Sequence, residues 1–198
     1  MLGALEAGQA PLVAGRLDLA RVGALGYSVG GSTVLQAALM DPRIAAVVNV
    51  DGALFGDPVD RLGSHAYLLI SSREAFPSPA ELASPEPAVR NYALLSAIDL
   101  PRNQQRIERP ANYWIAVEGA DHDDLSDALF AWSRAKMLRT NAARGAMNAA
   151  IEGYEVAFFR DALLGEPAAL LALLGGNHQT VRRISSASPA SGAASARQ

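Results

Sequence analysis

Short apolar runs, separated by polar stretches that contain glycine and proline, recur along the first two thirds of the chain. They are apolar nearly throughout, as in parallel strands buried on both faces of a sheet, and they cover residues 22–25, 44–50, 65–70 and 113–117. Helical patterns of apolar spacing lie between and after them, at residues 32–40, 84–98, 124–138 and 140–164. This alternation predicts an α/β fold with a mostly parallel sheet of about four strands and flanking helices.

The two ends of the chain depart from this pattern. Residues 1–19 carry Glu6 and no basic segment, which is unlike a signal peptide, and they are typical of the end of a helix followed by a loop. From Ser185 the sequence is small, polar and without periodicity. We therefore expect one domain over residues 1–175 and a disordered or poorly ordered tail over residues 176–198. No apolar run reaches the roughly 18 to 20 residues that span a bilayer, and the cytoplasm is the default expectation.

A glycine-rich turn, GYSVGG at residues 26–31, joins the first strand to the first helix. In a Gly-x-Ser-x-Gly nucleophile elbow, the glycines let strand and helix approach closely while the serine projects its hydroxyl from a strained turn. Gly26 and Gly30 occupy the glycine positions, so Ser28 is the candidate nucleophile. Such turns also bind phosphates, but this one has neither Gly-Lys-Ser/Thr nor the GxGxxG spacing.

A serine hydroxyl is a weak nucleophile at neutral pH and needs a general base, for which the chain offers three histidines. His122 follows the last strand, at the edge where the carboxyl ends of parallel strands meet. His65 begins a strand at the opposite end, where we expect a structural or solvent-facing role. His178 lies in the C-terminal region, where we expect a surface position. His122 is therefore the candidate base.

Two carboxylates at strand ends compete to orient this imidazole. Asp51 follows the second strand and Glu74 follows the third, so both lie at the correct edge of the sheet. The carboxylates nearest to the histidine in sequence flank it too closely to reach its far nitrogen easily, and we expect them to be solvated or to lie at a helix N-terminus; these are Asp121, Asp123 and Asp124. The spacing alone leaves the choice between Asp51 and Glu74 open.

Composition narrows the classes of partner. The chain has 198 residues, enough for one domain with a sizeable core, and half of them are apolar. Its 17 basic and 20 acidic residues give a net charge of −3 without a basic block, so nucleic acid is not an expected partner. Cysteine is absent, which excludes a disulfide, a thiolate nucleophile and a cysteine metal site. We expect no metal and no organic cofactor.

Several segments together resemble the platelet-activating-factor acetylhydrolase-like branch of the α/β-hydrolases. They lie between about residues 12 and 165 and read GYSVGGS (26–32), DPRI (41–44), VDGALF (50–55), ISSRE (70–74) and HDDLSD (122–127). In that branch the acid is the aspartate of the Asp-Gly segment, so the resemblance favours Asp51 over Glu74. Tyr27 and Leu125 depart from the family's common residues, which are His and Phe, and both changes are compatible with packing.

The resemblance also implies that strands precede the elbow strand in a complete α/β-hydrolase. Here the elbow strand begins near residue 20, so we expect the C-terminal part of that fold, with an open, apolar sheet edge through which the chain can self-associate. The backbone N–H of Val29 is the expected oxyanion donor, and we expect no second donor upstream.

The function expected from these residues is hydrolysis of a carboxylic ester, and the resemblance implies a short acyl group, including lipid-type esters. Ser28 attacks the acyl carbon, His122 transfers the proton, Asp51 orients His122, and Glu74 is the alternative acid. Two other classes stay open: a non-catalytic fragment or interaction module, and a thioesterase or peptidase on the same fold. Three aromatic side chains are candidates for a pocket, although core packing is the expected role of each: Tyr67, Trp114 and Trp132.

Overall fold

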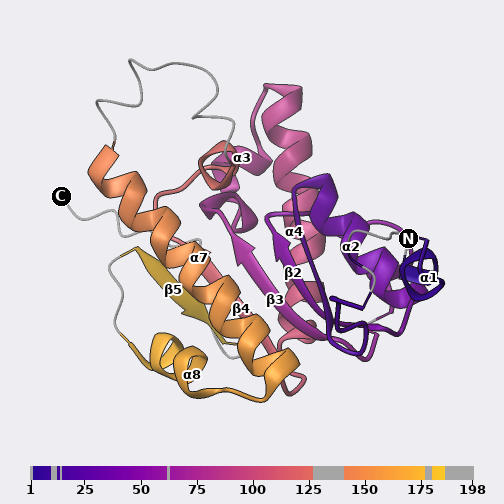
Figure 1. The fold of residues 1–198 in the computed structure, drawn as a ribbon. Coiled ribbons are helices and arrows are strands. Elements are labelled where there is room, and N and C mark those ends of the chain that lie inside the picture. The colour runs from indigo at the N-terminus through magenta and orange to yellow at the C-terminus, as the bar shows by residue number, and fades with distance from the viewer. Residues whose placement is uncertain are drawn as a thin grey trace.

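A computed structural model describes residues 2–9, 13, 15–61, 63–126, 141–176 and 180–185 of the chain. These residues form a five-stranded sheet of order β1-β2-β3-β4-β5, with helices on both faces (Figure 1). The strands are β1 (Val22–Tyr27), β2 (Ile44–Val50), β3 (Ala66–Ser71), β4 (Asn112–Val117) and β5 (Val181–Ile184). The first four strands pair in parallel, and β5 runs antiparallel to β4. The predicted α/β fold with a mostly parallel sheet is confirmed.

The helices connect the strands much as their apolar spacing predicts. They are α1 (Leu2–Glu6), α2 (Val29–Met40), α3 (Pro79–Leu82), α4 (Pro87–Arg106), α7 (Asn141–Leu164) and α8 (Ala168–Gly175). Helix α4 begins with Pro87, whose fixed φ suits a first helical turn, and it continues beyond the predicted end through Pro101. Most of the predicted helix at 124–138 lies outside the described residues; its start belongs to a 3₁₀ turn, His122–Leu125.

Each face of the sheet has its own apolar core. Alternate strand residues such as Val48, Leu68 and Ile115 pack against helices α7 and α8. The intervening residues, such as Val47 and Leu69, pack against α2 and the C-terminal half of α4. Burial of the strands on both faces is the reason that their sequences are apolar throughout rather than alternating.

Strand β5 corrects the prediction that residues 176–198 are a disordered tail. Val181 and Ile184 are buried on opposite faces of the sheet, while the two residues between them, Arg182 and Arg183, are exposed. A four-residue strand with two central arginines carries no apolar run, so the pattern that identified the other strands misses it. Residues 186–198 lie outside the described part of the chain.

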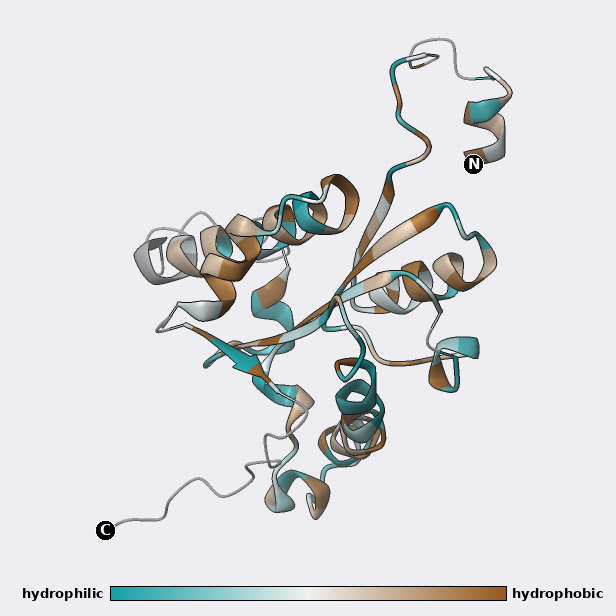
Figure 2. Cartoon of the chain, turned by 90° about the horizontal axis from the view of Figure 1, so that it is seen from below, coloured by the Kyte–Doolittle hydropathy of each residue, from teal (hydrophilic) through white to brown (hydrophobic). Residues whose placement is uncertain are grey.

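Strand β1 forms the other edge of the sheet, and its Leu25 is 46% exposed. Helix α1 lies apart from the sheet and its flanking helices (Figure 2). It contacts them through an ion pair between Glu6 and Arg43, which lies just before β2. Within the described residues, no helix is both long and apolar enough to cross a membrane.

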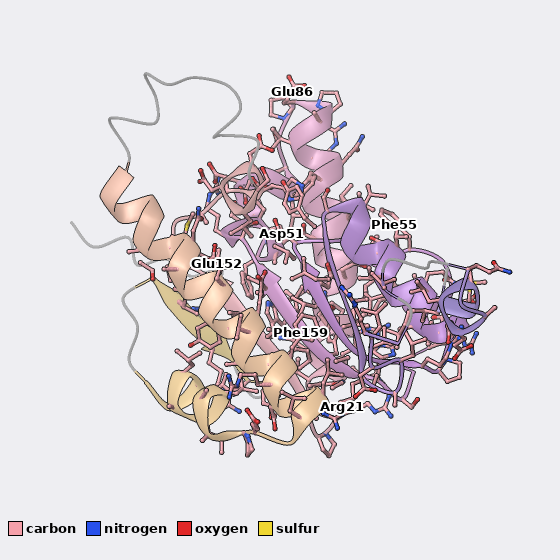
Figure 3. All side chains as sticks on the ribbon, viewed as in Figure 1. Arg21, Asp51, Phe55, Glu86, Glu152 and Phe159 are labelled. Carbon is pink, nitrogen blue, oxygen red and sulfur yellow. The ribbon has the colours of Figure 1, made fainter. Side chains whose placement is uncertain are left out.

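The parallel strands point their carboxyl ends to one end of the sheet. Figure 3 shows Asp51 at that end and Arg21, which precedes β1, at the other. Ser28 follows β1, Asp51 follows β2, and His122 follows β4 after a four-residue connection. The predicted nucleophile, acid and base therefore come to the same end of the sheet, as open α/β sheets arrange their sites.

Candidate active site

The turn between β1 and α2 holds Ser28 in a strained conformation. Ser28 has φ 56° and ψ −125°, a region that side chains rarely adopt. A Cβ on Gly26 would lie 2.2 Å from the carbonyl oxygen of Gly30, so the elbow requires glycine at position 26. A Cβ on Gly30 would have no described atom within 4 Å, which corrects the prediction that Gly30 serves this close approach. Gly31 serves it instead, since its Cβ would lie 2.0 Å from Asn49 Oδ1.

The loop after β2 is fixed by the fully buried side chain of Asn49. Its Oδ1 accepts from the Gly52 N–H at 2.8 Å, and its Nδ2 donates to the Gly52 carbonyl at 2.8 Å. Asp51, between them, has φ 52°. Because Asn49 holds the backbone on both sides of Gly52, it maintains this left-handed conformation, which costs of order 1 kcal/mol or more.

Further buried hydrogen bonds secure the same loop. Asp99 of α4 accepts from the Leu54 N–H at 2.8 Å, and the Ser32 hydroxyl of α2 donates to the Ala53 carbonyl. The Ser72 N–H donates to Asp51 Oδ1 at 2.8 Å, which leaves Oδ2 free to face the histidine. Ser72 thus holds one carboxylate oxygen of Asp51, and Asp99 and Ser32 hold the loop that follows it.

His122 links the carboxylate to the serine. Its Nδ1 lies 2.8 Å from Asp51 Oδ2, and its Nε2 lies 3.0 Å from Ser28 Oγ. The Tyr27 ring stacks on the imidazole with centroids 4.9 Å apart, and the Tyr27 hydroxyl donates to the His122 carbonyl at 3.0 Å. The loop is further tied by Arg73, which donates to Asp121 at 2.6 Å. Three segments distant in sequence therefore form one chain of hydrogen bonds.

The electrostatics suit a base. The hydrogen bond that His122 donates to Asp51 raises the pKa of His122 above its ordinary value of 6.5, against the opposing effect of burial. Negative charges on Asp51, Glu74 and Asp123 act in the same direction. With Nδ1–H donating to Asp51, the lone pair of Nε2 faces the Ser28 hydroxyl, which is the arrangement for removing its proton.

The other predicted histidines and acids lie elsewhere. His65 is buried at the amino end of β3, in agreement with a structural role, and His178 is outside the described residues. Asp121 and Asp124 cap the 3₁₀ turn that carries His122. Glu74, the alternative acid, has no hydrogen bond to the imidazole among the described contacts and acts on it through its charge; it lines a cavity together with Tyr92, whose hydroxyl is 3.5 Å from His122 Nδ1.

Val29, the expected oxyanion donor, directly follows Ser28 in the turn. Val29 is the first residue of α2, and its side chain is 69% exposed. The first N–H groups of a helix have no acceptor within the helix and point toward a bound anion. The Val29 N–H is one of these first helical N–H groups.

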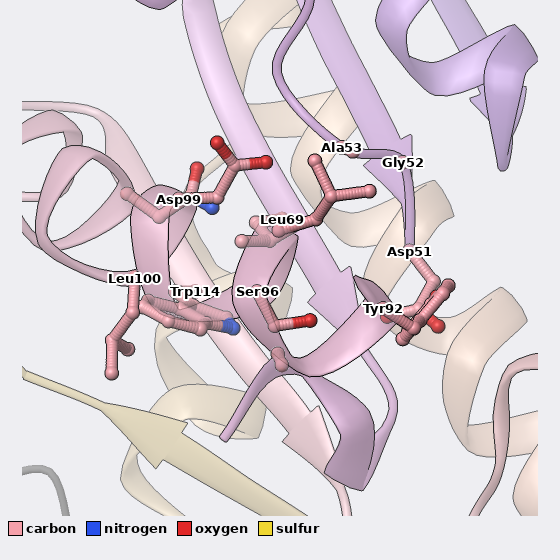
Figure 4. A pocket seen from close by; sticks show the side chains of 12 residues that line it. Asp51, Gly52, Ala53, Leu69, Tyr92, Ser96, Asp99, Leu100 and Trp114 are labelled. Atoms are coloured by element: carbon pink, nitrogen blue, oxygen red, sulfur yellow. The ribbon is translucent and has the colours of Figure 1, made fainter. Parts of the chain in front are cut away.

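A cavity of about 70 Å³ lies beside Asp51, between α4 and the ends of β2, β3 and β4 (Figure 4). Asp51 and Tyr92 line one end of it, and Asp99 lies at the other. Trp114 lines it too, but Trp114 and Tyr67 are both 1% exposed and belong to the core, as expected. Trp132 lies outside the described residues. Within the described part of the chain, no cluster of His, Cys, Asp and Glu is arranged to hold a metal.

Two residues of this site escaped the sequence interpretation. Asn49 is the polar exception in an apolar strand, directly before Asp51 and Gly52, and this position is a signal that could have identified it. Tyr92 lies in the N-terminal half of α4, and only the packing of that helix against the strand ends brings it to His122. No local pattern marks it.

Comparisons with known proteins concern the fold and one short segment of the chain. No family model matches the chain. A stretch of 41 residues, 21% of the chain, is 54% identical to a probable 1-alkyl-2-acetylglycerophosphocholine esterase of Arthroderma benhamiae and covers 11% of that protein. The structure resembles that of a ferulic acid esterase from Streptomyces cinnamoneus, with a TM-score of 0.57 and 21% identity over 85% of this chain and 48% of the other. The chain thus spans about half the length of that structure. Its fold is that of the α/β-hydrolases, and the resemblance to their acetylhydrolase-like branch, first indicated by the motifs, is confirmed.

Proposed function

We propose that the chain carries the catalytic triad of a carboxylic ester hydrolase, with Ser28 as nucleophile, His122 as base and Asp51 as the orienting acid. The observation that carries this proposal is the continuous chain of hydrogen bonds from Asp51 Oδ2 through His122 to Ser28 Oγ. Both similar proteins are esterases, which supports the same reaction class. Because the chain covers only part of either, the activity of a longer protein is part of the proposal.

The reaction proceeds in two halves. Ser28 Oγ attacks the acyl carbon as His122 Nε2 takes its proton, and the Val29 N–H donates to the resulting oxyanion. The intermediate collapses, and His122 returns the proton to the departing alkoxide, which leaves as an alcohol. Water then attacks the acyl-serine with His122 again as base, releasing the carboxylic acid and restoring Ser28.

We propose a short acyl group for the substrate. The relative from Arthroderma benhamiae is named for an acetyl ester of a lipid, and the structural neighbour for ferulic acid, which is a larger aromatic acid. Comparing acetyl, butyryl and feruloyl esters therefore distinguishes the two. Thioesters and amides tested with the same preparation separate an esterase from a thioesterase or peptidase, since the triad serves all three.

The first test is the hydrolysis of p-nitrophenyl acetate and butyrate by the purified chain and by its Ser28→Ala variant. Ser64→Ala is the matched control, because Ser64 is exposed at the opposite end of the sheet. We expect turnover in the wild type and in Ser64→Ala and loss in Ser28→Ala. Equal turnover by Ser28→Ala would exclude Ser28 as nucleophile. A folded wild-type chain without turnover would support the non-catalytic alternative.

Size-exclusion chromatography of the same sample tests a second proposal, that the open edge at β1 allows self-association. The exposed Leu25 on that edge supports it. Replacement of Leu25 by lysine is expected to shift an oligomer toward the monomer. A wild-type chain that elutes as a monomer at every concentration would contradict this proposal.

A further inference from the structure

Nδ1 of His122, which contacts Asp51, also lies near a second oxygen, the hydroxyl of Tyr92. The Tyr92 hydroxyl lies 3.5 Å from His122 Nδ1, and the two rings meet edge to face with centroids 6.1 Å apart. Figure 4 shows Tyr92 beside Asp51 at one end of the cavity between α4 and the strand ends. Tyr92 therefore reaches the same ring nitrogen as Asp51, but it comes from a different element.

Tyr92 in turn faces Glu74. Glu74 and Tyr92 line the same open cavity of about 330 Å³, and a hydrogen bond to Glu74 is among the causes that raise the pKa of Tyr92. Partial burial and then the negative charges of Asp51 and Glu74 raise the pKa of Tyr92, so the phenol keeps its proton and acts as a donor. A hydroxyl can donate one hydrogen bond and accept another at the same time.

We propose that Tyr92 and Glu74 form a second orienting arm for His122, in which Nδ1–H donates to the Tyr92 oxygen and the Tyr92 O–H donates to Glu74. The inference rests on the proposed role of His122 as base. Asp51 is the dominant partner, because its 2.8 Å contact is far shorter than that of Tyr92. The arm keeps the proton on Nδ1 and leaves Nε2 to accept from Ser28, so it preserves the productive tautomer when Asp51 is lost. Tyr92 and Glu74 are thus positioning residues.

A double-mutant cycle tests the arm. Asp51→Gly removes the carboxylate at a position with φ 52°, which glycine adopts without strain. We expect Tyr92→Phe to lower kcat/KM about threefold or less when Asp51 is present, and about tenfold or more in the Asp51→Gly background, as for one charge-assisted hydrogen bond. Equal factors in both backgrounds would overturn the proposal.

The Glu74→Gln variant removes the charge of Glu74 and keeps the size of its side chain, so it separates the effect of that charge from packing. Asp123→Asn is the matched control. Asp123 also raises the pKa of His122 through its negative charge, but it belongs to the histidine's own turn. In the Asp51→Gly background we expect Glu74→Gln to reduce kcat/KM as Tyr92→Phe does, with no further loss in the double variant. Independent losses that multiply would show that Glu74 does not act through Tyr92.

A titration of His122 by NMR provides a readout that does not depend on turnover, with the resonance assigned by its absence in His122→Gln. The groups that face the imidazole are Asp51, Glu74, Asp123, Tyr27 and Tyr92. In the Asp51→Gly background, we expect Tyr92→Phe and Glu74→Gln each to lower the pKa of His122 by about half a unit to one unit. An unchanged pKa in Tyr92→Phe would overturn the arm. If the wild type shows no Ser28-dependent turnover, ester hydrolysis fails as the function, while the titration still decides the arm.

Discussion

The two ends of the sheet place a histidine in opposite surroundings. At the carboxyl end, His122 donates to a carboxylate, and this hydrogen bond raises its pKa. At the amino end, His65 is 7% exposed, and neither ring nitrogen has a hydrogen-bond partner among the described residues. Burial, and then the positive charges of Arg106 and Arg109, lower the pKa of His65 to about 4.

The difference shows that the neighbours of an imidazole, rather than burial alone, decide whether it can act as a base. Both side chains are partly or wholly removed from water, and burial lowers the pKa of each. Only His122 has a carboxylate that stabilises its cation, together with a hydroxyl on its other nitrogen. His65 remains neutral at physiological pH and serves packing.

The largest expected effect comes from removing each histidine in turn. His122→Gln is expected to lower kcat for p-nitrophenyl acetate by about 10⁴- to 10⁶-fold, as for loss of the base in other serine hydrolases. His65→Gln is expected to stay within about threefold of the wild type, because His65 lies at the far end of the strands. Circular dichroism confirms that both variants are folded. Comparable losses in both would refute the assignment of the site to the carboxyl end.

The next effect concerns Asp51. Asp51→Asn is expected to lower kcat/KM by about 10³- to 10⁴-fold, because it favours the wrong tautomer of His122. His122 must be neutral to accept a proton, so kcat/KM of the wild type should rise with pH through a pKa above 6.5. The variant lacks the carboxylate that raises this pKa, so its residual activity should rise with pH through a lower pKa. Asp60→Asn, which removes an exposed carboxylate, is the control. An unshifted profile in Asp51→Asn would contradict the assigned acid.

The hydrogen bond between His122 and Asp51 also makes the stability of the fold depend on pH. Since folding raises the pKa of His122, its charged form stabilises the fold fully below the unfolded pKa of about 6.5, and this contribution is lost as the pH rises through the folded value.

Folding lowers the pKa of His65, so its effect on stability has the opposite dependence on pH. The change that we expect is smaller than those above. Its pKa falls from 6.5 in the unfolded chain to about 4 in the fold, so the stability present above pH 6.5 is lost as the pH falls toward 4. Over that interval the loss amounts to about 3 kcal/mol. Urea unfolding at pH 7 and pH 4 measures how far the free energy of unfolding falls between the two. We expect the fall to be smaller in His65→Leu than in the wild type, by this amount. Parallel falls in the two proteins would show that His65 does not titrate this way.

The sequence was sufficient to predict where the parallel strands end, and therefore which residues lie at the carboxyl end of the sheet. Strand ends can be located because buried parallel strands are apolar throughout, and residues that directly follow them must share an edge. This reasoning, with the Gly-x-Ser-x-Gly motif, identified Ser28 and His122 and left two candidate acids, of which the family resemblance favoured Asp51. The structure brings the side chains of Ser28, Asp51 and His122 into contact. The choice between Asp51 and Glu74 was not accessible from position, because both follow adjacent strands. It depends on side-chain direction, which Asn49 and the left-handed backbone at Asp51 determine.

Features that depend on packing between distant segments were beyond the sequence. Strand β5 is buried by its pairing with β4 and not by an apolar run. Tyr92 approaches His122 only because α4 packs across the strand ends. A glycine in the elbow motif also does not reveal which neighbour it approaches, and Gly30 was misjudged for that reason.

The smallest expected effect is a difference in stability between alanine variants of two neighbouring glycines at the carboxyl end, Gly30 and Gly31. Gly31→Ala is expected to lower the free energy of unfolding by about 1–3 kcal/mol, because its Cβ would lie 2.0 Å from Asn49 Oδ1 in a packed interior. Gly30→Ala is expected to be neutral or to stabilise by up to about 1 kcal/mol, since its Cβ meets no described atom and alanine is preferred in a helix. Urea unfolding of the two variants measures both values. Because Asn49 also fixes Gly52 beside Asp51, Gly31→Ala should reduce esterase turnover more than Gly30→Ala does. A Gly31→Ala protein with wild-type stability and turnover would mean that the elbow and the acid loop are not coupled through Asn49.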